Sequence, residues 1–318
     1  MRTPRIGVAA VAIATALAAC GSSSSSSTTK TTNPTPPAAA TGPGAGKPAV
    51  VIGDKNFTEE YVLGDLYAQA LQAKGYEVTL KPNIGSSEIT WKALVSGQIE
   101  MYPEYTGTLL TAIAQETTPP KSASQAYTQA KAYAEKHGFT LLNQTPFYDS
   151  DAIGALKSYV TKNGLTTIAD LKKLGRAVKL GGAPEFATRF EGLVGLKQQY
   201  GIDPTFTPLA IGLTYKALDT GQVQTSDVFT TDPQLGSGKY VLLTDPKHEF
   251  GYQNVALIIK KSVLAAEGPA FAQTVNAVSA LLTTKAIISM NAAVALNKQA
   301  LAEFYNSPLA ERLSLIHI

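Results

Sequence analysis

Three short segments of the sequence combine aromatic rings with cationic or hydroxyl side chains. They are Gly53–Glu59, Tyr102–Thr108 and Pro184–Arg189. The face of an aromatic ring attracts a cation, and each ring contributes about 0.5 to 2 kcal/mol. The planar fork of an arginine matches a carboxylate. A pocket that draws on all three segments can therefore hold a small molecule with a cationic end and an anionic end.

The sequence carries no pattern that indicates catalysis or a metal site. His137, His248 and His317 lie far apart without metal-ligand spacing, and there is no phosphate loop or Gly-x-Ser-x-Gly element. Glu59 and Glu104 could form an acid pair, but acids beside helix starts and turns are usually structural. We therefore expect no enzyme activity, no cofactor and no metal.

The first half of the chain alternates strand-like and helix-like patterns, which predicts an open sheet covered by helices. An apolar run that ends in glycine is typical of a buried parallel strand, and acids in the first turn are typical of a helix start. The expected elements are strands at Ala49–Gly53, Tyr76–Leu80 and Gln98–Tyr102, with helices that begin at Thr58 and at Ser86 or Ser87.

A similar pattern returns after the middle of the chain, so we expect two α/β lobes, each an open, mostly parallel sheet flanked by helices. Ligands of such sheets bind beyond the carboxyl ends of the strands. The loops after Gly53, Tyr102 and Gly181, and the one near Ser226, are therefore the expected site. The later elements are a helix start at Thr167–Leu171, a strand at Val178–Gly182, a helix at Glu191–Tyr200, a strand at Asn254–Ile259 and a helix at Pro269–Phe304.

The N-terminus predicts export and lipid attachment. Residues 1–20 have a basic start, an apolar stretch from Ile6 to Ala16 and the sequence Leu-Ala-Ala-Cys, which is typical of a lipoprotein signal peptide cleaved before Cys20. Cys20 is the only cysteine in the chain, which excludes an internal disulfide. Residues 21–47 are rich in Ser, Thr, Pro, Ala and Gly, so we expect a disordered tether.

The composition is that of an ordinary globular protein. Of the 318 residues, 44% are hydrophobic and 16% charged, with a net charge of +3 and scattered basic residues. This excludes a nucleic-acid-binding stripe. Leu313–Ile318 do not continue the helical pattern, and we assign them no function.

The sequence resembles the glycine betaine, carnitine and choline binding proteins of osmoprotectant ABC importers from about Val50 to about Asn297. Two elements carry the resemblance, Tyr105-Thr106-Gly107-Thr108 and the Glu185-Phe186 pair followed by Arg189. The resemblance implies a two-lobed periplasmic-binding-protein fold of type II. Residues 48–150 and 253–318 would form a discontinuous lobe 1, and residues 151–252 lobe 2, with crossings near Ser150 and Tyr252.

The resemblance also implies a monomeric, extracytoplasmic, lipid-anchored protein that passes a quaternary ammonium solute to ABC permease subunits with their ATPase. Thr108 stands where choline binders carry an acid, which favours a ligand with a carboxylate. The matching positions are Lys55, Thr108 and Arg189 for the ligand carboxylate, and Tyr105, Phe229 and Tyr252 for the aromatic cage.

Asp151 departs from the family pattern, because it stands where another cage tyrosine is usual. An acid at about 4 Å from a cation contributes up to about 4 kcal/mol at an effective dielectric near 20, before its desolvation is counted. Three interpretations stay open: Asp151 contacts the quaternary cation, it pairs with the N–H group of an amino acid or similar cation, or it caps a turn. A further alternative is a ligand-sensing domain that acts through a partner.

Overall fold

A computed structural model describes residues 41–296. The predicted signal peptide, Cys20, tether residues 21–40 and the segment 297–318, which includes Leu313–Ile318, lie outside the described residues. The strands are β1 (Val50–Gly53), β2 (Val78–Lys81), β3 (Met101–Tyr105), β4 (Phe139–Leu141), β5 (Asp151–Leu156), β6 (Lys179–Gly182), β7 (Thr205–Pro208), β8 (Thr225–Phe229), β9 (Tyr240–Leu242) and β10 (Val255–Lys260).

Helices connect and cover these strands. The α-helices are α1 (Thr58–Gln72), α2 (Ser87–Ser96), α3 (Thr106–Thr108), α4 (Ala123–Lys136), α5 (Lys157–Asn163), α6 (Thr214–Asp219), α7 (Lys261–Glu267), α8 (Pro269–Leu281) and α9 (Thr284–Ala295). Shorter 3₁₀ or π-helical turns are η1 (Leu109–Ile113), η2 (Ile168–Ala177), η3 (Pro184–Ala187), η4 (Phe190–Val194), η5 (Leu196–Tyr200) and η6 (Pro233–Ser237).

The strands form two five-stranded sheets, with the orders β2-β1-β3-β10-β4 and β7-β6-β8-β5-β9. In each sheet four strands run in the same direction, whereas β10 in the first and β5 in the second run the opposite way and pair antiparallel with both of their neighbours. Each sheet is thus mixed but mostly parallel, as the sequence predicted. Each of the two antiparallel strands is the first strand after the chain crosses from the other sheet.

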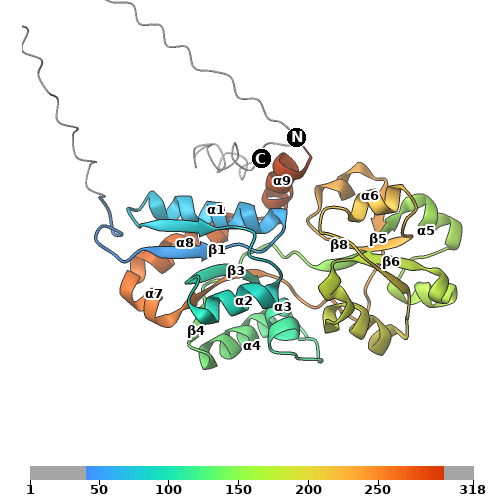
Figure 1. Ribbon diagram of the computed structural model, residues 1–318, viewed down its shortest axis with the longest axis horizontal. Helices are drawn as coiled ribbons and strands as arrows, with labels where there is room; N and C mark the ends of the chain where they lie inside the picture. The colour runs from blue at the N-terminus through green and yellow to red at the C-terminus, as the bar shows by residue number, and fades with distance from the viewer. Residues whose placement is uncertain (1–40, 297–318) are drawn as a thin grey trace, which may run out of the picture. The chain divides into compact units, whose positions relative to one another are not determined.

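The first sheet is covered on both faces. Figure 1 shows α1 and α8 on one side of it and α2 and α4 on the other. Side chains alternate along β10 because a strand has a period of two. Val255 and Leu257 join the core under α1 and α8, while Ala256 and Ile258 join the core under α2 and α4. This sandwich fixes the strand ends that carry the site.

The second sheet also separates two cores. Ile153 and Leu180 pack into a cluster with Phe186 and Phe250, and Val228 packs on the opposite face with residues of α6. All five strands of this sheet lie between residues 151 and 242. The exact lobe boundaries at 48–150, 151–252 and 253–318 stay a prediction.

The stretch from Pro269 to Phe304, predicted to be helical, is helical in its described part and consists of two helices, α8 and α9. Leu282 leaves the helical conformation, and the side chain of Thr283 accepts a hydrogen bond from the backbone of Ala286 to begin α9. Within residues 41–296, no single helix is long and apolar enough to cross a membrane, and only the bent pair α8 and α9 passes that test together. Both helices contribute buried residues to the first core.

Residues 41–47 correct the predicted tether, because they form hydrogen-bonded turns against the folded part of the chain. The backbone N–H of Gly44 donates to the carbonyl of Lys74 (3.0 Å), and Lys47 Nζ donates to the carbonyl of Ala266 (2.8 Å). A Cβ at Gly44 would lie 2.2 Å from the backbone nitrogen of Tyr76, so glycine is what permits this close approach. The prediction of disorder is therefore wrong for these residues.

Candidate functional site

The candidate site lies at the carboxyl ends of parallel strands from both sheets, as the sequence predicted. The loop after β1 carries Lys55, β3 ends at Tyr105, and Thr108 follows in α3. On the second sheet, Arg189 follows η3 beyond the end of β6, and Phe229 ends β8. Strand direction thus brings these side chains to one region although they are far apart in sequence.

One cavity is lined by residues from both sheets, and it includes six of the seven residues predicted to bind ligand. The seventh, Tyr252, is not among the lining residues. Its hydroxyl donates to the carbonyl of Lys121 (3.2 Å), and its ring stacks on His248 with centroids 5.6 Å apart. The structure therefore does not bring Tyr252 to the cavity. The six are Lys55, Tyr105, Thr108, Asp151, Arg189 and Phe229.

Three aromatic rings form one wall of the cavity. Phe57 stacks on Phe229, with centroids 5.4 Å apart and planes at 22°, and lies 6.0 Å from the ring of Tyr105. Phe57 is a cavity residue that the sequence interpretation missed, although it stands inside the segment Gly53–Glu59. Its aromatic type and its place directly after a strand end were the signals that could have identified it.

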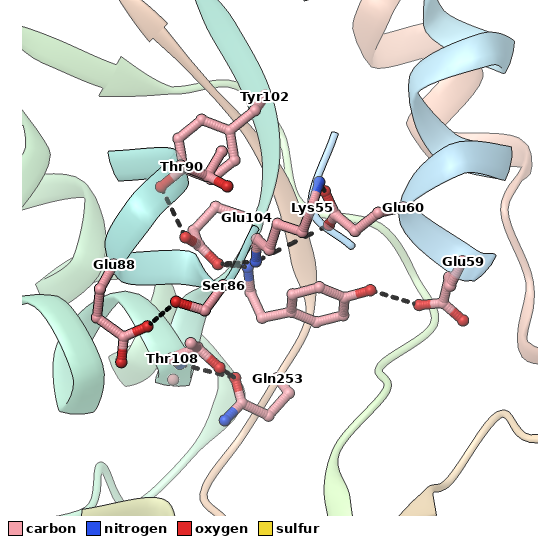
Figure 2. A network of polar contacts seen from close by, with 12 residues as sticks. Lys55, Glu59, Glu60, Ser86, Glu88, Thr90, Tyr102, Glu104, Thr108 and Gln253 are labelled. Carbon is pink, nitrogen blue, oxygen red and sulfur yellow. Dashed lines mark hydrogen bonds and ion pairs between the residues drawn. The ribbon is translucent and has the colours of Figure 1, made fainter. Parts of the chain in front are cut away.

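Lys55 is buried and already has carboxylate partners. Its Nζ lies 2.5 Å from Glu104 Oε1 and 3.9 Å from Glu60 Oε1, as Figure 2 shows. The same Nζ lies 4.6 Å from the ring centroid of Tyr105. Glu104 also accepts a hydrogen bond from the hydroxyl of Tyr102 (2.7 Å). The charge of Lys55 is therefore balanced by protein carboxylates inside the fold.

Thr108 and Gln253 form a polar edge of the cavity. The backbone N–H of Thr108 donates to Gln253 Oε1 (2.9 Å), and Gln253 Nε2 donates to Glu191 Oε2 (2.8 Å). Thr108 is 7% exposed, so these contacts hold it in place. They orient a hydroxyl that borders the cavity.

Arg189, which lines the cavity, makes a bidentate contact with Glu88, in the first turn of α2. Arg189 Nε lies 2.8 Å from Glu88 Oε1, and Arg189 Nη2 lies 2.8 Å from Glu88 Oε2. Burial alone would raise the pKa of Glu88, but the hydrogen bonds and charge of Arg189 outweigh it and lower the pKa to about 2. Glu88 was not predicted as a site residue, because no local pattern pairs it with Arg189.

Two aspartates on neighbouring strands border the same cavity, Asp227 buried and Asp151 half-buried. Asp151 pairs in register with Phe229, and Asp227 stands two residues earlier on β8, so both carboxyls lie on one face of the sheet. Burial raises the pKa of both groups, and the nearby charge of Asp151 raises the pKa of Asp227 further. The cavity thus contains a pair of neighbouring acids as well as rings and cations.

Asp54, in the loop beneath the site, is a buried carboxyl that favours its neutral form. Neither of its carboxyl oxygens has a hydrogen-bond partner among residues 41–296. Burial, and then the charge of Glu60, raise its pKa to about 9. A Cβ on Gly64 of α1 would lie 1.8 Å from Asp54 Oδ1, which explains a glycine inside this helix.

We expect Asp54→Asn to reduce the loss of stability with rising pH. Asp54 is neutral when folded up to a pH of about 9 but ionises above about 4 when unfolded, so stability falls as pH rises through this window. The free energy of unfolding in urea, measured at pH 5 and at pH 8, should decrease between the two pH values by at least about 2 kcal/mol less in the variant than in the wild type. Asp203→Asn, at an exposed position, serves as the control. An equal loss of stability at both pH values would contradict the prediction.

Within the described part of the chain, no group of three or more His, Cys, Asp or Glu side chains is arranged to hold a metal ion. The side chains that line the cavity and can contact a ligand are aromatic rings, hydroxyls, carboxyls and cations.

Solved structures similar to this chain share its fold. A crystal structure of a glycine betaine/carnitine/choline ABC transporter aligns with a TM-score of 0.66 at 24% identity, over 84% of this chain and 98% of that one. Apo YehZ from Escherichia coli aligns with a TM-score of 0.57 at 26% identity, over 84% of this chain and 98% of that one. These likenesses confirm the predicted α/β, two-lobed periplasmic-binding-protein fold.

Sequence comparisons give the family. A glycine-betaine-binding protein of Pseudomonas aeruginosa is 30% identical over 260 residues, which cover 78% of this chain and 83% of that protein. The family model described as the substrate binding domain of ABC-type glycine betaine transport system matches residues 48–306. The match confirms the predicted resemblance and the prediction that the chain is not an enzyme. The chain belongs to the family of substrate-binding domains of ABC-type glycine betaine transport systems.

Proposed function

We propose that the protein is an extracytoplasmic, lipid-anchored receptor that binds a glycine-betaine-like zwitterion between two lobes and delivers it to an ABC importer. The observation that carries the proposal is the cavity in which the rings of Phe57, Tyr105 and Phe229 form a wall and Arg189 supplies a guanidinium. A trimethylammonium group donates no conventional hydrogen bond, so aromatic faces are its natural partners.

The two ends of the ligand have separate partners in this proposal. The quaternary ammonium lies against the aromatic wall, and the carboxylate accepts from Arg189 and the hydroxyl of Thr108. Lys55 contributes its positive charge from beneath Tyr105 while it stays paired with Glu104. The relatives named as glycine betaine-binding proteins in Pseudomonas aeruginosa and Escherichia coli support this ligand class.

Transport requires more than the cavity. Closure of lobe 1 (48–150 and 253–318) on lobe 2 (151–252) would trap the ligand and present a closed form to the permease and its ATPase. The lipid on Cys20 and the tether that follows would keep the monomeric receptor near the membrane. A decrease in the radius of gyration on addition of ligand, measured by small-angle scattering, is the expected sign of closure.

Calorimetric titration of the soluble form that starts after Cys20 tests the ligand class. We expect binding of glycine betaine, and a fall in affinity of about tenfold in Phe57→Ala, because one cation–π partner is worth about 1 to 2 kcal/mol in a desolvated site. Tyr252→Ala is the matched aromatic control, since Tyr252 lies outside the cavity. An equal loss of affinity in both variants would contradict an aromatic wall made of Phe57, Tyr105 and Phe229, and it would favour a cage that includes Tyr252.

A second candidate is supported by the acid pair of Asp151 and Asp227. Two carboxyls that line the cavity suit a ligand with N–H donors, such as an amino acid, better than a trimethylammonium group. The same titration decides between the two candidates when carnitine, choline, proline and a basic amino acid are included. Binding of an N–H cation without betaine binding, lost in Asp151→Asn, would favour this second candidate.

A further inference from the structure

We propose that Glu88 is an internal counter-carboxylate that occupies the fork of Arg189 in the ligand-free protein and thereby sets the preference between ligands with and without a carboxylate. This inference rests on the proposed function, because it assigns Arg189 to the ligand carboxylate. It adds a specificity-determining residue that lies outside the predicted site.

The geometry of the pair is that of a carboxylate ligand already in place. Both oxygens of Glu88 accept from one edge of the guanidinium, Nε and Nη2, at 2.8 Å each. The remaining nitrogen, Nη1, lies 3.8 Å from Glu191 Oε1. A ligand carboxylate that seeks a bidentate contact therefore meets an arginine that already faces protein acids on both sides.

The charges around Arg189 oppose a further anion. Glu88, Glu191 and Asp151 all act on the charge of Arg189, whose side chain is only 15% exposed. Burial, and then the charge of Asp151, raise the pKa of Glu191 to about 7 although Arg189 lowers it. An additional carboxylate would increase like-charge repulsion unless one acid gives up its place.

Glu88 is the acid that can withdraw. Its side chain is 33% exposed, whereas that of Glu191 is 1% exposed. Glu88 lies in the first turn of the ten-residue helix α2, where the helix dipole favours a negative charge. Ser86 Oγ also donates to Glu88 Oε2 (2.6 Å), and Figure 2 shows both residues at the start of the helix. These contacts remain available to Glu88 after it releases Arg189.

Exchange of the Glu88 carboxylate for a ligand carboxylate at Arg189 changes the affinity only of ligands that carry a carboxylate. A zwitterion such as glycine betaine must displace Glu88 to reach Arg189, so part of its binding free energy is offset by the lost pair. A cation without a carboxylate, such as choline, leaves the pair intact. Removal of the charge of Glu88 should therefore favour the zwitterion selectively.

Titration of Glu88→Gln with glycine betaine and with choline tests the inference. We expect glycine betaine to bind about 5- to 20-fold more tightly than to the wild type, which corresponds to losing one charge-assisted competitor, while choline changes less than twofold. Glu135→Gln, which removes an exposed i,i+4 partner of Lys131, is the matched control and should change neither ligand. Weaker binding of glycine betaine to Glu88→Gln would overturn the proposal, since it would mean that Glu88 positions Arg189 for the ligand.

A second measurement is independent of the ligand. Phenylglyoxal modifies accessible guanidinium groups, and mass spectrometry gives its rate at Arg189 in the ligand-free protein. We expect faster labelling of Arg189 in Glu88→Gln than in the wild type or Glu135→Gln, and equal rates would overturn the proposal. Failure of the wild type to bind any quaternary ammonium would instead overturn the proposed function, while the labelling rates would still report whether Glu88 occupies the fork.

Discussion

Arg189→Ala is expected to lower the affinity for glycine betaine by about tenfold or more while choline binding changes less than threefold. Hydrogen bonds to a charged group contribute about 1.5 to 3 kcal/mol each, and a bidentate carboxylate contact makes two of them. At 1.4 kcal/mol per tenfold change, the two bonds are worth at least about 100-fold in affinity, and displacement of Glu88 offsets about 5- to 20-fold of this, so a net loss of about tenfold or more remains. Calorimetric titration of both ligands into the wild type and the variant measures the ratio directly.

Two further variants make the result specific to the fork. Arg189→Lys keeps the charge but not the planar pair of donors, so we expect an intermediate loss. Arg176→Ala removes another arginine that is ion-paired, to Asp203 at 2.6 Å, but is largely exposed, and should leave both affinities unchanged. A similar loss for choline and glycine betaine in Arg189→Ala would show that Arg189 acts through the protein's conformation and not through the ligand carboxylate.

Lys55→Met is expected to destabilise the folded protein by about 3 to 5 kcal/mol, because removal of one partner of a buried ion pair leaves an uncompensated charge. Lys55 is 2% exposed, and its Nζ lies 2.5 Å from Glu104 Oε1. Glu60 lies close as well, and burial raises its pKa to about 8 even though the charge of Lys55 lowers it. Urea unfolding followed by circular dichroism gives the change in free energy.

The double variant Lys55→Met with Glu104→Gln identifies the cause of that loss. If the uncompensated carboxylate is responsible, the second substitution restores part of the stability, as a double-mutant cycle would quantify. Lys173→Met serves as a control, because Lys173 pairs with Asp170 at 2.7 Å but is 67% exposed, and it should change stability little. A loss in Lys55→Met that Glu104→Gln does not reduce would assign the effect to packing of the aliphatic chain.

The elements with continuous apolar runs could be predicted from the sequence. Val50–Gly53 ends in a glycine before a polar loop, and α1 begins at Thr58 with two acids in its first turn, so local residues determine both. β3 begins at Met101, three residues beyond the predicted start at Gln98. The bounds of β3 follow from its pairing with β10, where Val255 lies opposite Tyr105. Because β10 is distant in the sequence, the residues around β3 do not indicate where this pairing begins.

The region of Glu191–Tyr200 shows a similar limit. Its spacing predicted one regular helix, but Glu191 and Gly192 leave the helical conformation, and two π-helical turns, η4 and η5, take its place. Glu249 Oε1 accepts a hydrogen bond from the backbone N–H of Gly192 (3.0 Å), whereas inside a regular helix this N–H would donate to a backbone carbonyl. A tertiary hydrogen bond thus replaces part of the expected ladder.

The strand ends predicted which loops carry the candidate site, and the resemblance to the family predicted which residues in those loops line it. Lys55, Thr108 and Arg189 follow strand ends within short distinctive segments, and all three line the cavity. Asp227 was missed because it lies inside β8, where nothing in its neighbours marks it as a cavity residue. The role of Tyr252 depends on where its side chain turns, which the spacing of residues does not determine.

The central place of β10 has a consequence for the order of assembly. β10 lies between β3 and β4, yet it follows the whole second sheet in the chain. Until residues 255–260 are available, β3 and β4 present unpaired edges, which are templates for association with other chains. The second sheet takes all of its strands from one continuous stretch of the chain and has no such dependence. A chain that stops before Val255 therefore contains every strand of the second sheet, while its first sheet keeps unpaired edges that can associate with other chains.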